Sequence, residues 1–166
     1  GDKAYAQTPH WINIGTGSQN DVCLKENEDL DGTHNAVLAE AASRMQGLDT
    51  GYAIQEGDRF SISYSWKDSW QWSDAGDQVN VRLFTTGDNT ISGTPVDLVA
   101  VPSGVRKVED AYELVDQDNF YTATAADDGK ILFVALDTLD GGGGADGFAR
   151  VDNFELSVVN IAPVLP

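Results

Sequence analysis

Hydrophobic and polar side chains alternate along two stretches of this chain. In residues 59–66, Phe60, Ile62, Tyr64 and Trp66 occupy every second position, and serines stand between them. Successive side chains of a β-strand point to opposite faces, so this stretch is predicted to be a strand with one buried face. Residues 78–84 repeat the pattern, with Val79, Val81 and Leu83 on one side and Gln78, Asn80, Arg82 and Phe84 on the other.

Shorter apolar runs between turn-forming residues predict further strands. They cover residues 12–14, 96–101, 120–125, 131–136 and 150–159. Residues 34–45 have a helix-forming composition but follow Asp31-Gly32, so they fit either a helix or a strand that runs into a polar turn, and the strand is favoured. The run Asp127-Asp-Gly-Lys predicts a hairpin turn before residue 131. Seven or more short strands predict an all-β protein, an antiparallel β-sandwich or jelly roll.

Length and tail composition predict one domain followed by a linker. A chain of 166 residues that is 41% hydrophobic can bury one proper core. We assign residues 1–159 to a single module. Residues 160–166 carry two prolines and have the composition of a stiff interdomain linker, so a longer parent chain is expected.

The charge balance excludes several classes of partner. Acidic residues number 27 and basic residues 10, which gives a net charge of −17. Nucleic acids and anionic lipid surfaces are therefore not expected as partners, and no apolar run approaches the length of a membrane span. The single cysteine, Cys23, allows no disulfide within the chain and is expected to be a small buried residue. Such acidity fits a secreted, extracellular protein.

Several segments together resemble the β-sandwich carbohydrate-binding modules of families 4, 16 and 22. The chain has an extended start that leads to Trp11, a turn at Asp31-Gly32-Thr33 and a glutamine-containing segment at Met45-Gln-Gly-Leu48. It continues with the alternating strand that ends at Trp66 and closes with a strand that carries Asp152. The resemblance implies a noncatalytic module that docks a secreted enzyme, or another surface protein, onto polysaccharide.

Tryptophans in polar sequence are candidate sugar platforms. Sugars present an apolar C–H face and a rim of hydroxyl groups, so their sites combine aromatic rings with hydrogen-bonding side chains. Trp70 and Trp72 stand in the polar stretch that follows Trp66. If strands 59–66 and 78–84 pair, serines of the first would lie beside polar side chains of the second and form a shallow groove. That predicted site comprises Trp70, Trp72, Arg82, Asn80, Gln78, Phe84, Ser63 and Ser65, and the alternative is an ordinary solvated face.

Calcium is a second expectation. The chain has a surplus of carboxylates, the ligands that calcium prefers, although the acidic run at residues 26–32 is not an EF-hand loop. The resemblance implies one structural calcium ion held by Asp152, the Gly32 carbonyl, and Asp31 or Asp2.

Two alternatives to noncatalytic sugar binding stay open. The proline-rich tail also fits a structural or adhesive β-sandwich of a multidomain surface protein. A small polysaccharide lyase or hydrolase is less favoured, because the predicted groove positions carry no pair of carboxylates for acid and base catalysis. A monomer is expected in either case.

Overall fold

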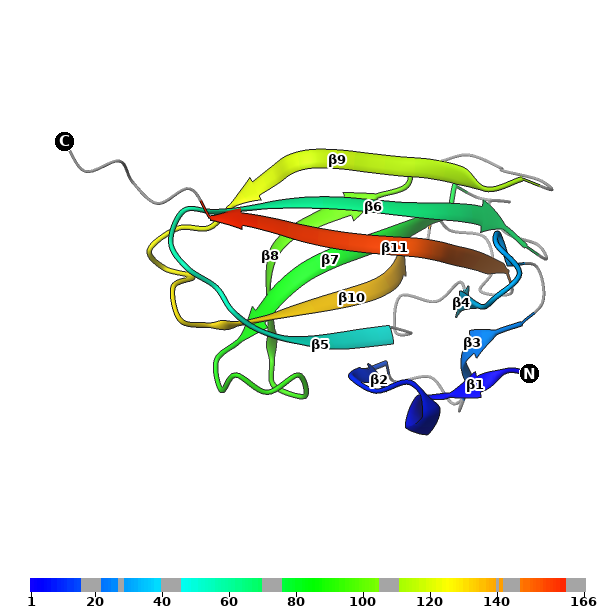
Figure 1. Ribbon diagram of the computed structural model, residues 1–166, viewed down its shortest axis with the longest axis horizontal. Coiled ribbons are helices and arrows are strands. Elements are labelled where there is room, and N and C mark those ends of the chain that lie inside the picture. The colour runs from blue at the N-terminus through cyan, green and yellow to red at the C-terminus, as the bar shows by residue number, and fades with distance from the viewer. Residues whose placement is uncertain are drawn as a thin grey trace.

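Two antiparallel β-sheets lie face to face and form a sandwich (Figure 1). This computed structural model describes residues 1–15, 22–26, 29–39, 46–69, 76–104, 111–139, 141 and 147–160. The six-stranded sheet has the order β1-β3-β4-β11-β6-β9, and the five-stranded sheet has the order β2-β5-β10-β7-β8. The predicted antiparallel β-sandwich is confirmed. Within the described residues, no helix has the length and apolar character needed to cross a membrane.

The strands follow one another along nearly the whole described chain. Their bounds are β1 Lys3–Ala4, β2 Trp11–Asn13, β3 Val22–Lys25, β4 Asn35–Ala39, β5 Gln46–Ala53, β6 Asp58–Asp68, β7 Gln78–Thr86, β8 Pro95–Pro102, β9 Glu113–Thr122, β10 Ile131–Leu139 and β11 Phe148–Asn160. A short 3-10 helix, η1, covers Tyr5–Gln7. The strand favoured for the start of residues 34–45 is confirmed as β4, and the rest of that segment lies outside the described residues. The strand predicted at 120–125 is wrong in its bounds, because β9 begins earlier and ends at Thr122.

The core lies between the sheets and uses the alternating positions of β6. Phe60, Ile62, Tyr64 and Trp66 are all at most 2% exposed. From the five-stranded sheet, β7 and β10 supply the opposing side chains, which are Val79, Val81, Leu83, Leu132, Val134 and Leu136. The two alternating stretches therefore bury the faces that the sequence predicts.

The predicted pairing of β6 with β7 is wrong. β6 pairs with β11 and β9, whereas β7 pairs with β10 and β8. The two strands cover the same core from opposite sides. Alternation shows that each strand has one buried face, but it does not distinguish side-by-side neighbours from strands that face each other across a core.

The turn at residues 127–130 connects the two sheets. Gly129 adopts a φ of 76°, as the Asp-Gly signal predicts. The strands on either side are β9 of the six-stranded sheet and β10 of the five-stranded sheet, so the predicted hairpin is wrong. A tight turn at this position can lead into either sheet, because its local geometry does not depend on the partner of the next strand.

Two matching tyrosine–aspartate hydrogen bonds close the connections at this end of the sandwich. The Tyr52 hydroxyl donates to Asp58 at 2.8 Å, and the Tyr121 hydroxyl donates to Asp127 at 2.7 Å. Each carboxylate also accepts a backbone N–H from the residue three positions before it, at 2.8 Å in both turns. Burial acts to raise the pKa of both carboxyl groups, but the hydrogen bonds outweigh it and hold each pKa below 3.8.

The sandwich is open along one side. β4 pairs with β11 only over residues 148–151, which leaves the second half of β11 as an edge. β2 pairs with β5 only over residues 46–48, which leaves the second half of β5 as an edge of the other sheet. Between these two edges, Tyr52, Phe154 and Leu156 are half-buried, while Phe60 and Leu132 behind them are buried.

Candidate functional site

Arg82 lies in the middle of β7 on the outer face of the five-stranded sheet. Its neighbours Val81 and Leu83 are buried in the core, so strand alternation turns Arg82 away from the core. Across the sheet it stands opposite Ala135 of β10 and Ala100 of β8. These small residues leave space for the long side chain over the neighbouring strands.

Two carboxylates hold the Arg82 guanidinium. Arg82 Nη1 donates to both oxygens of Asp97, at 2.8 and 3.0 Å, and Nη2 lies 3.5 Å from Asp137 Oδ2. The Asp97 side chain is 51% exposed, while those of Arg82 and Asp137 are only 15% and 9% exposed. The solvent side of this group therefore consists of the Arg82–Asp97 ion pair, in which donors and acceptors lie side by side.

Asp137 is the buried partner, and its acidity is altered. Burial raises the pKa of Asp137 to about 6, against the lowering effects of the Thr138 N–H and the Arg82 charge. The nearby Asp97 charge acts in the same direction as burial. The hydrogen bond from the Thr138 N–H and the positive charge of Arg82 both favour an ionised Asp137 at neutral pH.

Phe84, a predicted site residue, is 1% exposed and does not reach solvent. On the outer face it packs with Phe133, and Ile14 and Ile91 cover the pair. The backbone at Gly47 lies close to the Ile14 side chain, because a Cβ atom on Gly47 would be only 2.8 Å from it. This part of the face is a second small hydrophobic core.

Asn80 and Gln78 share the strand but differ in exposure. Asn80 stands opposite Asp137 and is only 3% exposed, so the prediction that it lines an open groove is wrong. Gln78, at the start of β7, is half-buried and stands opposite Leu139. Of the predicted site residues that are described on this face, Gln78 and Arg82 reach solvent. Asp97, which was not predicted from the sequence, is exposed beside Arg82.

Ser63 and Ser65 belong to the other sheet, so the predicted groove is not one surface. Ser63 lies on the outer face of the six-stranded sheet between Glu155 and Asp116, in a hollow of about 180 Å³. Ser65 stands opposite Asp152 and is 8% exposed. The sandwich core separates both serines from Arg82. Trp70 and Trp72 lie outside the described residues, and their role remains a prediction.

Asp152, the first predicted calcium ligand, is buried beneath a turn. Its carboxylate accepts the N–H of Leu30 and the N–H of Asn153, both at 2.8 Å. Asp29 of the same turn has a buried Oδ2 atom without a hydrogen-bond donor. That atom lies 3.9 Å from the position that a Cβ on Gly32 would take. A carboxylate oxygen without a hydrogen-bond donor is the kind of ligand that calcium accepts.

The other predicted ligands are already engaged. Asp31 accepts hydrogen bonds from the Thr33 N–H and hydroxyl at 3.1 and 2.6 Å. Asp2 is paired with Lys25 at 2.8 Å, and this hydrogen bond lowers its pKa. Within the described ranges, no three acidic, histidine or cysteine side chains gather as a metal cluster. Asp31 and Asp2 thus already have partners, whereas Asp29 keeps a buried carboxylate oxygen without a hydrogen-bond donor.

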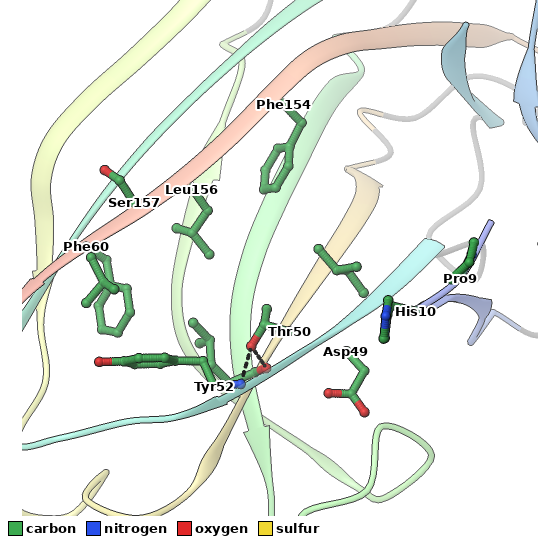
Figure 2. Close-up of a pocket in the computed structure, with 12 residues that line it drawn as sticks. Pro9, His10, Asp49, Thr50, Tyr52, Phe60, Phe154, Leu156 and Ser157 are labelled. Carbon is green, nitrogen blue, oxygen red and sulfur yellow. Dashed lines mark hydrogen bonds between the residues drawn. The ribbon is translucent and has the colours of Figure 1, made fainter.

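A groove opens between the sheets along the exposed edges of β5 and β11 (Figure 2). We call it the edge groove. It measures about 490 Å³, and its described lining is Pro9, His10, Leu48, Asp49, Thr50, Tyr52, Phe60, Leu132, Phe154, Leu156, Ser157 and Val158. This groove was not predicted from the sequence. The one signal for it was the alternation of Phe154, Leu156 and Val158 in the predicted last strand, because these residues form the β11 wall of the groove. The sequence does not show that a partner strand ends before it reaches them.

Comparison with known proteins identifies the fold by structure alone. No known sequence family matches the chain, and no curated protein matches it by sequence. A xylan-binding domain from Paenibacillus barcinonensis, of carbohydrate-binding module family 22, superposes with a TM-score of 0.60 at 14% identity, over 97% of this chain and 92% of that domain. The chain has the fold of the β-sandwich carbohydrate-binding modules.

Two further structures show how widely this fold occurs. A Clostridium thermocellum xylanase with a family 22 module matches with a TM-score of 0.57 at 14% identity. The match covers 89% of this chain but only 26% of that enzyme. A cyclase from Fischerella sp. TAU, solved with an indolyl butanone, matches with a TM-score of 0.62 at 13% identity, over 95% of this chain and 88% of the cyclase. The module fold thus occurs both as a binding domain and in an enzyme.

The effect of replacing Arg82 on stability at two pH values tests the electrostatics of this site. Because the pKa of Asp137 is raised, the folded state holds its proton more tightly than the unfolded state, and stability is lost as the pH rises from 3.8 through about 6. Arg82→Gln removes the cation that offsets this loss. The variant should therefore lose more free energy of unfolding at pH 8 than at pH 5, by roughly 1 kcal/mol. Urea denaturation at both pH values measures the difference.

Arg59→Gln, at an exposed position of β6, is the matched control and should show the same change at both pH values. An equal loss for Arg82→Gln at the two pH values would contradict the assignment.

Proposed function

We propose that this protein is a noncatalytic module that binds an extracellular polysaccharide and holds a parent enzyme or surface protein on it. The shared fold supports this, because one of the matching structures is described as a xylan-binding domain. The match to a quarter of a larger xylanase supports a role as one module among others. Secretion of the parent chain is part of the proposal.

The Arg82–Asp97 ion pair on the outer face of the five-stranded sheet is the observation that carries the proposal. The Arg82 guanidinium is fixed by two short hydrogen bonds to Asp97, whose half-exposed carboxylate beside it offers acceptors to solvent. Neighbouring hydroxyl groups of a sugar ring both donate and accept, so they can bind both members of the pair. Because the pair is already rigid, less side-chain entropy is lost on binding than with two free side chains.

Aromatic platforms complete the proposed site. Trp70 and Trp72 fall in the link between β6 and β7, and Trp72 precedes Gln78 of β7 by six residues. Stacking of a sugar ring on an indole buries the apolar C–H face of the sugar, which polar groups alone do not do.

Charge favours a neutral polysaccharide over an acidic one. Within the described strands of the five-stranded sheet, Arg82 is the only lysine or arginine, whereas Asp49, Asp97 and Asp137 are acidic. Two of these carboxylates already hold the Arg82 charge. A uronate or sulfate group would therefore meet a net negative surface.

Substitutions at the proposed site should weaken binding without unfolding the module. Trp70→Ala, Trp72→Ala and Arg82→Lys should each weaken retention on an immobilised neutral polysaccharide by roughly tenfold, because each removes a stacking surface or the guanidinium fork. Ser63→Ala, on the outer face of the six-stranded sheet, is the control and should bind as the native protein does. Affinity electrophoresis across a polysaccharide panel, with melting temperatures for every variant, measures the effect.

Unchanged retention of all three variants would contradict the site. Failure of the native protein to bind any polysaccharide would contradict the function and favour a structural or adhesive module.

We further propose a structural calcium ion at the turn that holds Asp152. Asp152, Asp31 and the Gly32 carbonyl would bind it, and the orphaned Asp29 oxygen supports an additional ligand there. Asp2 remains a proposed ligand only if it leaves Lys25. When bound, the ion would neutralise the carboxylates of Asp29 and Asp152 and fix this turn against β11.

Calcium should then raise the melting midpoint. Excess calcium should shift the midpoint upward by about 5 °C relative to protein in chelator, since a ligand that binds only the folded state stabilises it. Asp152→Asn should abolish the shift, whereas Asp116→Asn, an exposed position of β9, should keep it. Scanning calorimetry with and without chelator measures this, and an unmoved midpoint in the native protein would rule the ion out.

A further inference from the structure

The edge groove is a preformed opening into the apolar interior. Phe60 and Leu132 form its floor and are at most 2% exposed, while Tyr52, Phe154 and Leu156 form half-buried walls. Figure 2 shows Tyr52 of β5 and Leu156 of β11 on opposite sides of the groove. The volume of about 490 Å³ falls within the range of small-molecule sites, about 300 to 1,000 Å³.

The hydroxyl groups of Thr50 and Tyr52, on the β5 side of the groove, already have hydrogen-bond partners. The Thr50 hydroxyl donates to the Leu132 carbonyl at 2.7 Å and accepts the Tyr52 N–H at 3.1 Å. The Tyr52 hydroxyl donates to Asp58 at 2.8 Å. A sugar ring placed here would bury hydroxyl groups with few partners, which is unfavourable. The groove therefore suits an apolar body rather than a carbohydrate.

The β5 edge is also closed to an added strand. The Asp49 N–H donates to the His10 carbonyl at 3.0 Å, and the Gly51 N–H donates to the Asp49 carboxylate at 2.9 Å. The Tyr52 N–H is held by Thr50, as above. Strand addition depends on free edge amides, so a peptide would find none at these three positions.

The charge around the edge groove restricts the charge of the molecule that can bind in it. No lysine or arginine is among the described residues that line the edge groove, and Asp49 is the acidic one. The whole chain carries a net charge of −17. A negatively charged molecule would be repelled by this net charge and would find no lysine or arginine among the described lining residues.

We propose that the edge groove binds a small aromatic or alicyclic molecule that carries no negative charge. Its ring packs between Tyr52 and Leu156 above Phe60, and its polar end stays at the solvent-exposed mouth. The site is separate from the Arg82–Asp97 pair, which lies on the outer face of the five-stranded sheet. The proposal therefore stands apart from polysaccharide binding.

Three probes with one phenyl ring and different charge test the proposal. Phenethyl alcohol and phenethylamine should shift the backbone amide NMR signals of Thr50, Tyr52 and Leu156 in the native protein, and hydrocinnamate should bind at least about tenfold more weakly. Val158→Trp should fill the mouth and weaken both binding probes about tenfold, since Val158 lines the groove and is 38% exposed. Val96→Trp is the matched control, because Val96 is 54% exposed on β8, outside the groove.

The outcomes separate the two proposals. The groove proposal is overturned if neither binding probe shifts these amides, if hydrocinnamate binds equally well, or if Val158→Trp binds the probes as Val96→Trp does. Loss of polysaccharide retention in Val158→Trp would place the groove in the sugar site and would also overturn it. Native protein that binds the phenyl probes but no polysaccharide would instead contradict only the proposed function.

Discussion

The contact between the two sheets across β6 is the constraint on which the rest of the structure depends. Phe60, Tyr64 and Trp66 are fully buried there against β7 and β10. Burying one large apolar side chain contributes about 1.5 to 3 kcal/mol, and a whole domain is stable by only about 5 to 15 kcal/mol. Because the inner faces are buried in this contact, a ligand can reach only the outer faces and the open side of the sandwich.

Those remaining surfaces differ in chemistry because different segments cover them. Near Phe84, Ile14, which follows β2, and Ile91, from the β7–β8 connection, close over the five-stranded sheet and form a small second core. Beyond it, Arg82 and Asp97 remain at the surface as a fixed polar pair. Along the open side, partner strands end early, and apolar side chains of the interior line the edge groove. One sandwich thus carries a polar pair, where we propose that sugars bind, and an apolar groove on a separate surface.

The clearly alternating strands and their buried faces could be predicted from the sequence, but β1, β3 and β5 were not among the predicted strands, and strand partners could not be predicted. Alternation at residues 59–66 and 78–84 reports a property of each strand alone, and it placed both correctly against the core. Whether Ser63 lies beside Arg82 depends on how the chain crosses between sheets, which alternation does not encode. Asn80 and Phe84 were placed on the correct face, yet they are buried. Phe84 is covered by Ile14 and Ile91, from segments distant in sequence from each other.

The most direct test of the account is an NMR titration with neutral oligosaccharides. Backbone amides of the labelled protein would be followed as xylo- and gluco-oligosaccharides are added, with calcium present. The account predicts that the largest shifts cluster on β7 and β8 around Arg82 and Asp97, with little change on β9 and β11. Shifts centred on the six-stranded sheet, or none with any sugar in the panel, would contradict it.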